Sequence, residues 1–173
     1  SVAEASPADV DSACAEALAA APAWAATPPA ERAAALWRAA ERFEAHSAEL
    51  LGLIVRESGK SLPNAVAEIR EAVDFLRYYG AQARATFGND THRALGPMAC
   101  ISPWNFPLAI FSGQVAAALA AGNTVLAKPA EETPLVAAMA VELLLEAGVP
   151  AGALQFLPGA GEVGAALVAD ARV

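Results

Sequence analysis

The chain has 173 residues, of which 56% are hydrophobic and 17% charged, and its formal net charge is −8. This length and apolar content suit one globular domain and exclude a disordered chain, although much of the apolar fraction is alanine, which favours helix but adds little buried area. The acidic balance, without a cluster of lysine or arginine, argues against nucleic acid as a partner, because backbone phosphates would be repelled.

The first half of the sequence is expected to be helical. The Ser-Pro pair at 6–7 is typical of a helix start, with serine as the cap, and the alanine-rich stretch behind it runs to about Trp24. The Thr-Pro pair at 27–28 gives the same signal for a second helix. A weak break at 46–47 separates this helix from a third, which is expected to end at Ser58 because a glycine follows.

A fourth, longer helix is expected after Ser61, which would cap it, and it reaches the Gly-Asn-Asp turn at 88–90. Apolar residues recur along this helix at helical spacing and are expected to form one buried stripe, which consists of Val66, Ile69, Val73 and Leu76. The sequence gives no strand signal before residue 96.

From Gly96 onward, predicted strands and helices alternate. The expected order is a strand at 98–101, a helix at 107–121, a strand at 123–127, a helix at 133–147, a strand at 154–157 and a final helix after Gly159. Such alternation predicts a parallel sheet, and ligands bind beyond the carboxyl ends of the strands in sheets of this kind. The expected fold class is α/β, with a helical part at 1–95 followed by a Rossmann-like parallel βαβαβα unit at 96–173.

The first motif with chemical potential is the segment 101–108, Ile-Ser-Pro-Trp-Asn-Phe-Pro-Leu, at the end of a predicted strand. Pro103 and Pro107 stiffen the turn, so the Asn105 amide is held in a restricted place. An amide N–H aimed at a carbonyl oxygen stabilises the negative charge that develops when a thiolate adds to an aldehyde, typically by about 3 kcal/mol. The alternative is an asparagine that satisfies the turn backbone, beside an aromatic pair that plugs the end of the sheet.

The second motif is the segment 127–134, Ala-Lys-Pro-Ala-Glu-Glu-Thr-Pro, which follows the next predicted strand. Lys128 as donor and Glu131 as acceptor could hydrogen-bond the two hydroxyls of an adenosine ribose. A carboxylate there would repel a 2′-phosphate, which favours NAD over NADP, although Lys128 weakens that preference. The alternative is a helix start with favourable acidic residues and a lysine that extends to solvent, which explains Glu132 well.

Together with the segment 70–79, Arg-Glu-Ala-Val-Asp-Phe-Leu-Arg-Tyr-Tyr, these motifs resemble the aldehyde dehydrogenase superfamily. The resemblance is greatest to the L-glutamate γ-semialdehyde (1-pyrroline-5-carboxylate) dehydrogenase module of bifunctional bacterial proline-utilisation enzymes. It implies the NAD-binding domain of such an enzyme and NAD-dependent oxidation of the semialdehyde to glutamate, with Asn105 as the oxyanion donor. The family's nucleophilic cysteine, its general-base glutamate and its catalytic and oligomerisation domains would lie beyond Val173, so the chain alone is expected to be inactive.

The resemblance also implies binding residues. Those expected to contact NAD are Ile101, Ser102, Pro103, Trp104, Lys128, Glu131, Gly161 and Glu162. The last two belong to the segment 159–164, which matches the fingerprint GxGxxG, but a lone match is common and the acidic residue that would support it falls outside the chain. Glu71 and Phe106 are expected near the substrate, and the alternative for Glu71 is a solvated carboxylate or an ion pair with a helix neighbour.

Neither cysteine is expected to act as the nucleophile. Cys100 lies within an apolar strand, with no His, Lys or Arg beside it to lower its pKa, and Cys14 is expected in the core side of the first helix. Their spacing suits neither a metal site nor a disulfide, which favours a reducing compartment, the cytoplasm. Neither a signal peptide nor a membrane span is expected from the N-terminal residues or from the interrupted apolar run 115–127.

The expected partners are a small aldehyde, a fused flavin-dependent proline dehydrogenase in the native polypeptide, and further copies of the complete protein in a homo-oligomer. Two other interpretations stay open: a different NAD(P)-dependent aldehyde dehydrogenase, and a non-catalytic domain with a structural role. A sheet that stops early is expected to leave an unpaired edge and an uncovered face, so the isolated chain should aggregate or associate tightly.

Overall fold

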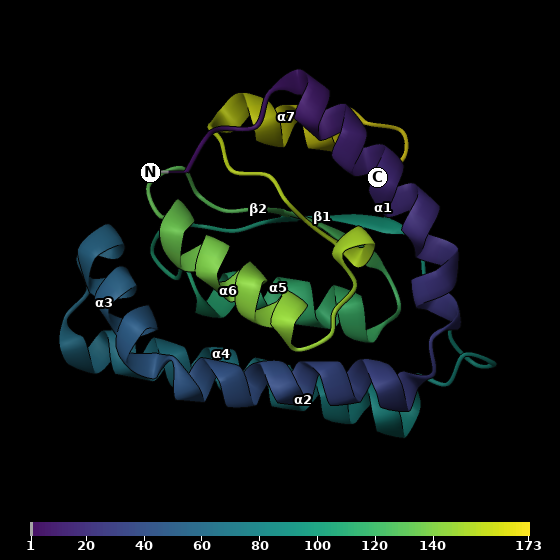
Figure 1. The fold of residues 1–173 in the computed structure, drawn as a ribbon, viewed down its shortest axis with the longest axis horizontal. Coiled ribbons are helices and arrows are strands. Elements are labelled where there is room, and N and C mark those ends of the chain that lie inside the picture. The colour runs from purple at the N-terminus through teal and green to yellow at the C-terminus, as the bar shows by residue number, and fades with distance from the viewer. Residues whose placement is uncertain (1) are drawn as a thin grey trace.

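A three-stranded parallel sheet lies between two groups of helices in the computed structural model, which describes residues 2–173 (Figure 1). The strand order is β1 (Pro97–Ile101), β2 (Thr124–Lys128) and β3 (Leu154–Phe156), and both pairings are parallel. The connecting helices are α5 (Ala109–Ala120) and α6 (Pro134–Glu146), a short 3-10 turn covers Ala151–Ala153, and α7 (Gly161–Ala169) follows β3. The expected α/β class with a parallel sheet is confirmed.

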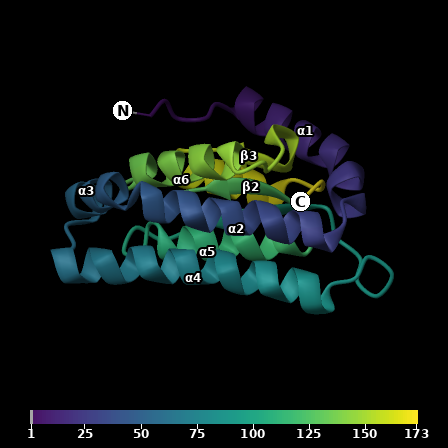
Figure 2. The same cartoon turned by 60° about the horizontal axis from the view of Figure 1, so that its bottom comes forward.

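The helical region before the sheet contains four helices, as expected. They are α1 (Pro7–Ala26), α2 (Pro29–Ala45), α3 (Ser47–Ser58) and α4 (Leu62–Thr86). The start of α1 is a capping box, in which the Ser6 and Asp9 side chains each accept from the other's backbone N–H. Figure 2 shows α2 and α4 side by side, with α5 next to them. Helices α2, α3 and α4 form an outer layer that packs on the connecting helices α5 and α6, which in turn pack on the sheet.

Three details of the sequence-based expectation are wrong. The Thr27 hydroxyl donates to the Ala23 carbonyl oxygen (3.0 Å) and so closes α1, while α2 begins one residue later than the Thr-Pro signal indicates. Val66 is 46% exposed, because it lies beside the buried stripe of α4 and not in it. Ser61 and Thr133 occupy cap positions, but their side chains make no capping hydrogen bond.

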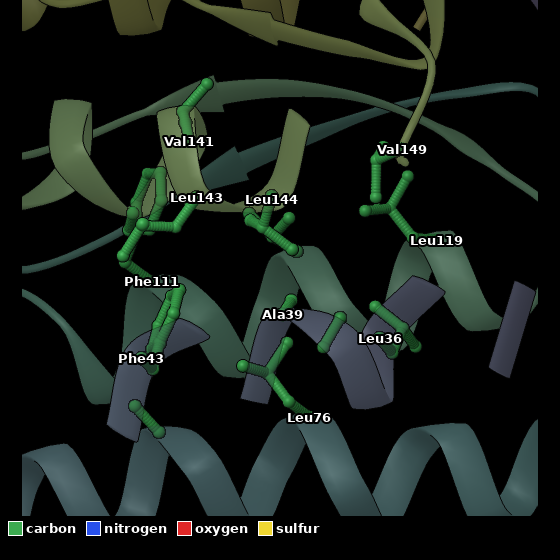
Figure 3. Close-up of a cluster of buried hydrophobic side chains, with 14 of the residues drawn as sticks. Leu36, Ala39, Phe43, Leu76, Phe111, Leu119, Val141, Leu143, Leu144 and Val149 are labelled. Carbon is green, nitrogen blue, oxygen red and sulfur yellow. The ribbon is translucent and has the colours of Figure 1, made fainter. Parts of the chain in front are cut away.

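The larger core cluster fills the space between the sheet, its connecting helices and the outer helical layer. Figure 3 shows its central side chains, which include Leu36, Phe43, Leu76, Phe111 and Leu144. Ala39 and Ala40 of α2 are fully buried, and their small side chains allow the helices on either side to approach α2 closely. The alanine content therefore permits close helix packing here.

A second core cluster covers the other face of the sheet. Leu126 of β2 points into this cluster with Cys14 of α1 and Leu167 of α7, whereas the flanking Val125 and Ala127 belong to the larger cluster. The alternation along β2 shows a strand buried on both faces. The expectation of an uncovered face is thus wrong, because α1 packs on this face of the sheet together with α7 (Figure 1).

Charged side chains from the outer layer reach both ends of α5. The Glu68 carboxylate accepts hydrogen bonds from the backbone N–H groups of Leu108 (2.8 Å) and Ala109 (3.2 Å) at the start of this helix. At the other end, Arg32 Nε donates to the Ala120 carbonyl oxygen (3.1 Å). An anion at the start and a cation at the end both match the helix dipole and satisfy groups that a helix leaves unpaired.

The same arrangement recurs at α6. The Glu57 carboxylate of α3 accepts from the N–H groups of Leu135 and Val136, both at 2.8 Å. Arg38 of α2 donates through Nε to the Ala147 carbonyl oxygen at 2.7 Å. The outer layer is therefore matched in charge, as well as in apolar surface, to the two helices that it covers.

Candidate functional site

The carboxyl ends of the three strands bring the two sequence motifs to one edge of the sheet. Ile101 pairs with Lys128 at the last position of the β1–β2 ladder, and Phe156 ends β3 on the other side of β2. The turn 102–108 follows β1 and the segment 129–133 follows β2. The motifs are thus neighbours in space, at the edge where parallel sheets bind ligands.

The turn after β1 is anchored to β2 at its base and open at its tip. Ser102 N donates to the Lys128 carbonyl oxygen at 3.1 Å, and Ser102 is buried, with no hydrogen-bond partner for its Oγ among residues 2–173. Trp104 is 53% exposed and Phe106 is 39% exposed. The two rings therefore do not plug the end of the sheet, which was the structural alternative for this motif.

Asn105 lies at the exposed tip of this turn. The backbone closes the turn below it, since Ile110 N donates to the Phe106 carbonyl oxygen (3.3 Å) and Ser112 N to that of Leu108 (2.8 Å). Within the described part of the chain, no hydrogen bond ties the Asn105 amide to the turn backbone. Its side chain thus stays available to a ligand, while the backbone under it is held.

Two residues that we did not single out from the sequence, Lys60 and Glu68, hold the second half of the turn. The Glu68 side chain is fully buried, and one of its oxygens caps α5 at Leu108 and Ala109. The other oxygen forms an ion pair with Lys60 Nζ, and this ammonium lies 3.8 Å from the centre of the Phe106 ring. A buried ion pair and a cation–π contact therefore meet beside Asn105.

The sequence contained a signal for Glu68. Ala65, Ile69 and Ala72 are all buried on α4, and Glu68 lies between them at helical spacing, so a charged residue occupies the buried stripe. Such a residue needs a partner, and Lys60 is a candidate eight positions earlier. The sequence did not indicate that the backbone start of α5 would be the other partner.

At the end of β2, Lys128 is buried to 6% exposure and Glu131 is exposed. The Lys128 stem runs past α7, where Cδ and Cε lie 3.9 Å from the place that a Cβ on Gly164 would take. In the described residues, the Lys128 ammonium has no ion-pair partner, and Glu132 is exposed as well. The stem is therefore buried, but Lys128 Nζ is not among the buried polar atoms without a partner, so the alternative of a lysine extended to solvent stays open.

The glycine-rich segment after β3 forms a close approach between turn and helix. A Cβ on Gly159 would lie 2.5 Å from Val163 Cγ2, so only glycine fits there without a shift. Gly161 begins α7 and has open space around its Cα, and both Gly161 and Glu162 are exposed. Packing explains the first glycine of the fingerprint, whereas Gly161 has no packing role that would account for it.

Glu71 lies on the outer face of α4, exposed to solvent, one turn after Glu68. Glu71 lines an open pocket together with Asp74, Phe75 and Tyr78. Phe75, one of its lining residues, packs against Gly113 of α5, so the pocket lies beside the contact of α4 with α5. The predicted role of Glu71 near a substrate thus stays a prediction, and a solvated carboxylate describes its surroundings in this chain.

Both cysteines are buried, and neither has the surroundings of a nucleophile. Burial raises the pKa of Cys100 to about 12. Burial, followed by the negative charge of Asp170, raises the pKa of Cys14. Residues 2–173 contain no cluster of side chains that could hold a metal ion, and none of their helices has the length and apolar character needed to span a membrane.

The comparisons with known proteins all point the same way. The sequence model described as "Aldehyde dehydrogenase family" matches residues 1–173. The bifunctional protein PutA of Escherichia coli (strain K12) is 63% identical over 173 residues, which cover 99% of this chain and 13% of that protein. The 1-pyrroline-5-carboxylate dehydrogenase of Bacillus cytotoxicus is 43% identical over 162 residues, which cover 86% of this chain and 32% of that protein.

Solved structures agree in fold. A crystal structure of a bifunctional proline utilization A protein superposes with a TM-score of 0.96 at 48% identity, over 100% of this chain and 19% of that one. The crystal structure of a 1-pyrroline-5-carboxylate dehydrogenase from Thermus with bound NAD gives a TM-score of 0.93 at 36% identity, over 99% of this chain and 36% of that one. The chain thus spans between about an eighth and a third of the length of these relatives.

Proposed function

Because the chain belongs to the aldehyde dehydrogenase family, we propose that it binds NAD and stabilises the oxyanion in an enzyme that oxidises L-glutamate γ-semialdehyde to glutamate. The observation that carries this proposal is the shared edge of the sheet. Asn105 leaves it from β1 on a held turn, and Lys128 ends the adjacent strand with its ammonium unpaired among the described residues. A hydride acceptor and a carbonyl would meet there.

Asn105 would act on the carbonyl oxygen of the substrate. When a thiolate adds to the aldehyde carbon, the electron pair of the carbonyl bond moves to oxygen, and the Asn105 amide N–H donates to the resulting oxyanion. Neither Cys14 nor Cys100 can supply that thiolate, since both thiols are buried and protonated near neutral pH. We expect the nucleophile from another part of the natural protein that contains this chain.

The residues at the sheet edge fit a dinucleotide. The Lys128 stem is buried and its ammonium has no partner among the described residues, so Lys128 with Glu131 would hold the hydroxyls of the adenosine ribose. Exposed Gly161 and Glu162 at the start of α7 would lie toward the adenosine, and residues 101–104 would line the strand-end side. Bound NAD would supply the acceptor for the hydride that leaves the substrate carbon.

The proposed substrate and partners are inferred from the proteins to which the chain is similar. Proteins named bifunctional PutA and 1-pyrroline-5-carboxylate dehydrogenase match nearly the whole chain, which supports glutamate semialdehyde as the aldehyde and proline catabolism as the context. Glu71 and Phe106 would border this substrate. A fused flavin-dependent proline dehydrogenase and a homo-oligomer of the complete protein belong to the same proposal. Residues 1–95 and 96–173 would be two parts of one NAD-binding domain, because the larger core cluster draws on both.

Calorimetric titration of the natural protein with NAD tests the cofactor site. We expect Lys128→Ala and Glu131→Ala each to weaken NAD binding about tenfold or more, because each removes a hydrogen bond that involves a charged group. Glu132→Ala is the matched control, an adjacent exposed carboxylate with no assigned contact, and should change the affinity by less than about twofold. Equal affinities for all four proteins would contradict the assigned site.

A substrate profile of the natural protein tests the aldehyde. The ratio kcat/KM should be higher for glutamate semialdehyde than for propanal or benzaldehyde, and Asn105→Ala should lower kcat by about 10²–10³ for every aldehyde, because the oxyanion forms with each. A preference for an uncharged aldehyde would favour a different member of the family. No turnover of any aldehyde, together with no NAD binding, would favour a non-catalytic domain.

A further inference from the structure

We infer that Lys60 and Glu68 form a clamp that positions Asn105 for catalysis, an inference that rests on the proposed oxyanion role of Asn105. The Lys60–Glu68 clamp joins three segments that are distant in sequence: the start of α4, the start of α5 and the turn between β1 and α5. Neither residue is expected to touch the substrate. Both would act through the backbone on either side of Asn105.

Glu68 fixes the downstream end of the turn. One carboxylate oxygen accepts from two consecutive backbone N–H groups, those of Leu108, the last residue of the turn, and Ala109, the first residue of α5. The side chain is fully buried, and a buried carboxylate is tolerated only when it is hydrogen-bonded and paired with a cation. Lys60 supplies that cation, with its side chain 15% exposed.

Lys60 fixes the middle of the turn. Its ammonium contacts the free oxygen of Glu68 on one side and lies 3.8 Å from the centre of the Phe106 ring on the other. Phe106 is bonded directly to Asn105, and its ring is partly exposed (39%), while its carbonyl oxygen accepts from Ile110 N. A residue that served only to cap α5 would have no need of a cation over this ring. The contact with Phe106 is what extends the clamp to Asn105.

Asn105 depends on such support because its own side chain is not tied down by hydrogen bonds within residues 2–173. An oxyanion donor works when it lies about 2.7–3.1 Å from the developing charge, and a misplacement of about 1 Å can cost on the order of a hundredfold in rate. The prolines restrict the turn but do not fix it to α4. The clamp provides that attachment.

A double-mutant cycle on the natural protein tests the clamp. We expect Lys60→Met to lower kcat about tenfold or more while the KM for NAD stays within about twofold, because the ammonium acts on the oxyanion donor and not on the cofactor. If it acts through Asn105, the same substitution made in the Asn105→Ala protein should lower kcat by less than about twofold. Arg84→Met is the matched control, since it removes an exposed cation from above the Trp37 ring near the C-terminal end of α4, and kcat should not change.

The outcomes separate the clamp from the proposed function. An equal loss of kcat from Lys60→Met in both backgrounds, or no loss in either, would overturn the clamp. If Asn105→Ala alone lowers kcat and Lys60→Met does not, only the clamp falls. If Asn105→Ala leaves kcat unchanged, both the proposed oxyanion role of Asn105 and the clamp are overturned.

A second variant covers the case in which Lys60→Met does not fold, since it leaves the Glu68 charge buried and unpaired. Lys60→Met combined with Glu68→Gln removes both charges, and the amide oxygen can still accept from Leu108 and Ala109. This variant should fold, keep α5 capped and still show the loss of kcat that disappears in the Asn105→Ala background. A folded variant with full kcat would overturn the clamp.

Discussion

Replacement of Arg32 by methionine should destabilise the junction of α1, α2 and α5 by about 3 kcal/mol. Arg32 is 2% exposed, and its guanidinium donates to the carbonyl oxygens of Thr27 (2.6 Å) and Ala120 (3.1 Å), with longer or partly exposed contacts to Ala25 and Asn89. Methionine keeps the length and the apolar stem but leaves the buried Ala120 carbonyl without its Arg32 donor, and the Thr27 carbonyl keeps only a longer bond from the Asn89 amide (3.3 Å).

The magnitude follows from the two short hydrogen bonds to backbone carbonyls. A hydrogen bond to a charged group contributes about 1.5–3 kcal/mol, so these two would give about 3–6 kcal/mol if nothing opposed them. Burial lowers the pKa of Arg32, which shows that the charged form is already penalised in the folded protein. The net loss should therefore lie near the lower end of that range.

Native-state hydrogen exchange on the natural protein measures this effect locally. A loss of about 3 kcal/mol corresponds to exchange about a hundredfold faster for amides around Thr27 and Ala120 that open with this junction. Arg42→Met is the matched control on the same helix, because its ion pair with Glu146 is about half exposed and contributes about 0–1 kcal/mol. A change below threefold for Arg32→Met, or an equal change for the control, would refute the reasoning.

Three further predictions concern the described residues. Burial raises the pKa of Cys100 to about 12, so the stabilisation from its neutral thiol is complete below about pH 9 and is lost as the pH rises toward 12. Iodoacetamide at pH 8 should leave Cys100 unlabelled in peptide mass spectra, and rapid labelling would contradict its burial. Hydrogen bonds from Ser6 lower the pKa of Asp9, so the stabilisation of α1 by this cap is present above about pH 4 and is lost as the pH falls through the lowered pKa. Ser6→Ala should return the carboxyl pKa toward 3.8 in an NMR titration, and an unchanged pKa would show that the cap does not cause the shift. Gly159→Ala should destabilise the turn before α7 by about 1–3 kcal/mol, because the new Cβ would meet Val163; a thermal melt that does not shift would mean that the helix moves without cost.

The sequence alone determined the order of elements and the place of both motifs. Start signals such as the Ser-Pro pair at 6–7, glycines after the helices and the alternation after Gly96 are local, so they can be read without knowledge of the fold. Parallel strands then require their carboxyl ends to share one edge, which brought Asn105 and Lys128 together in advance of any structure. The burial of Cys100 also followed from its apolar strand.

The tertiary structure decided which side chains pair over long distances. Glu68 and Leu108 are 40 residues apart, and Arg32 and Ala120 are 88 apart, so no local pattern connects them. Helical spacing shows roughly which face of a helix is buried but not where the covered surface ends, so Val66 was placed in the stripe. One face of the sheet was expected to be bare because the sheet stops early, and the sequence did not show that α1 packs on it. A charged residue inside a buried stripe demands a partner, but only the packing of α4 on α5 shows that the partner is a backbone terminus.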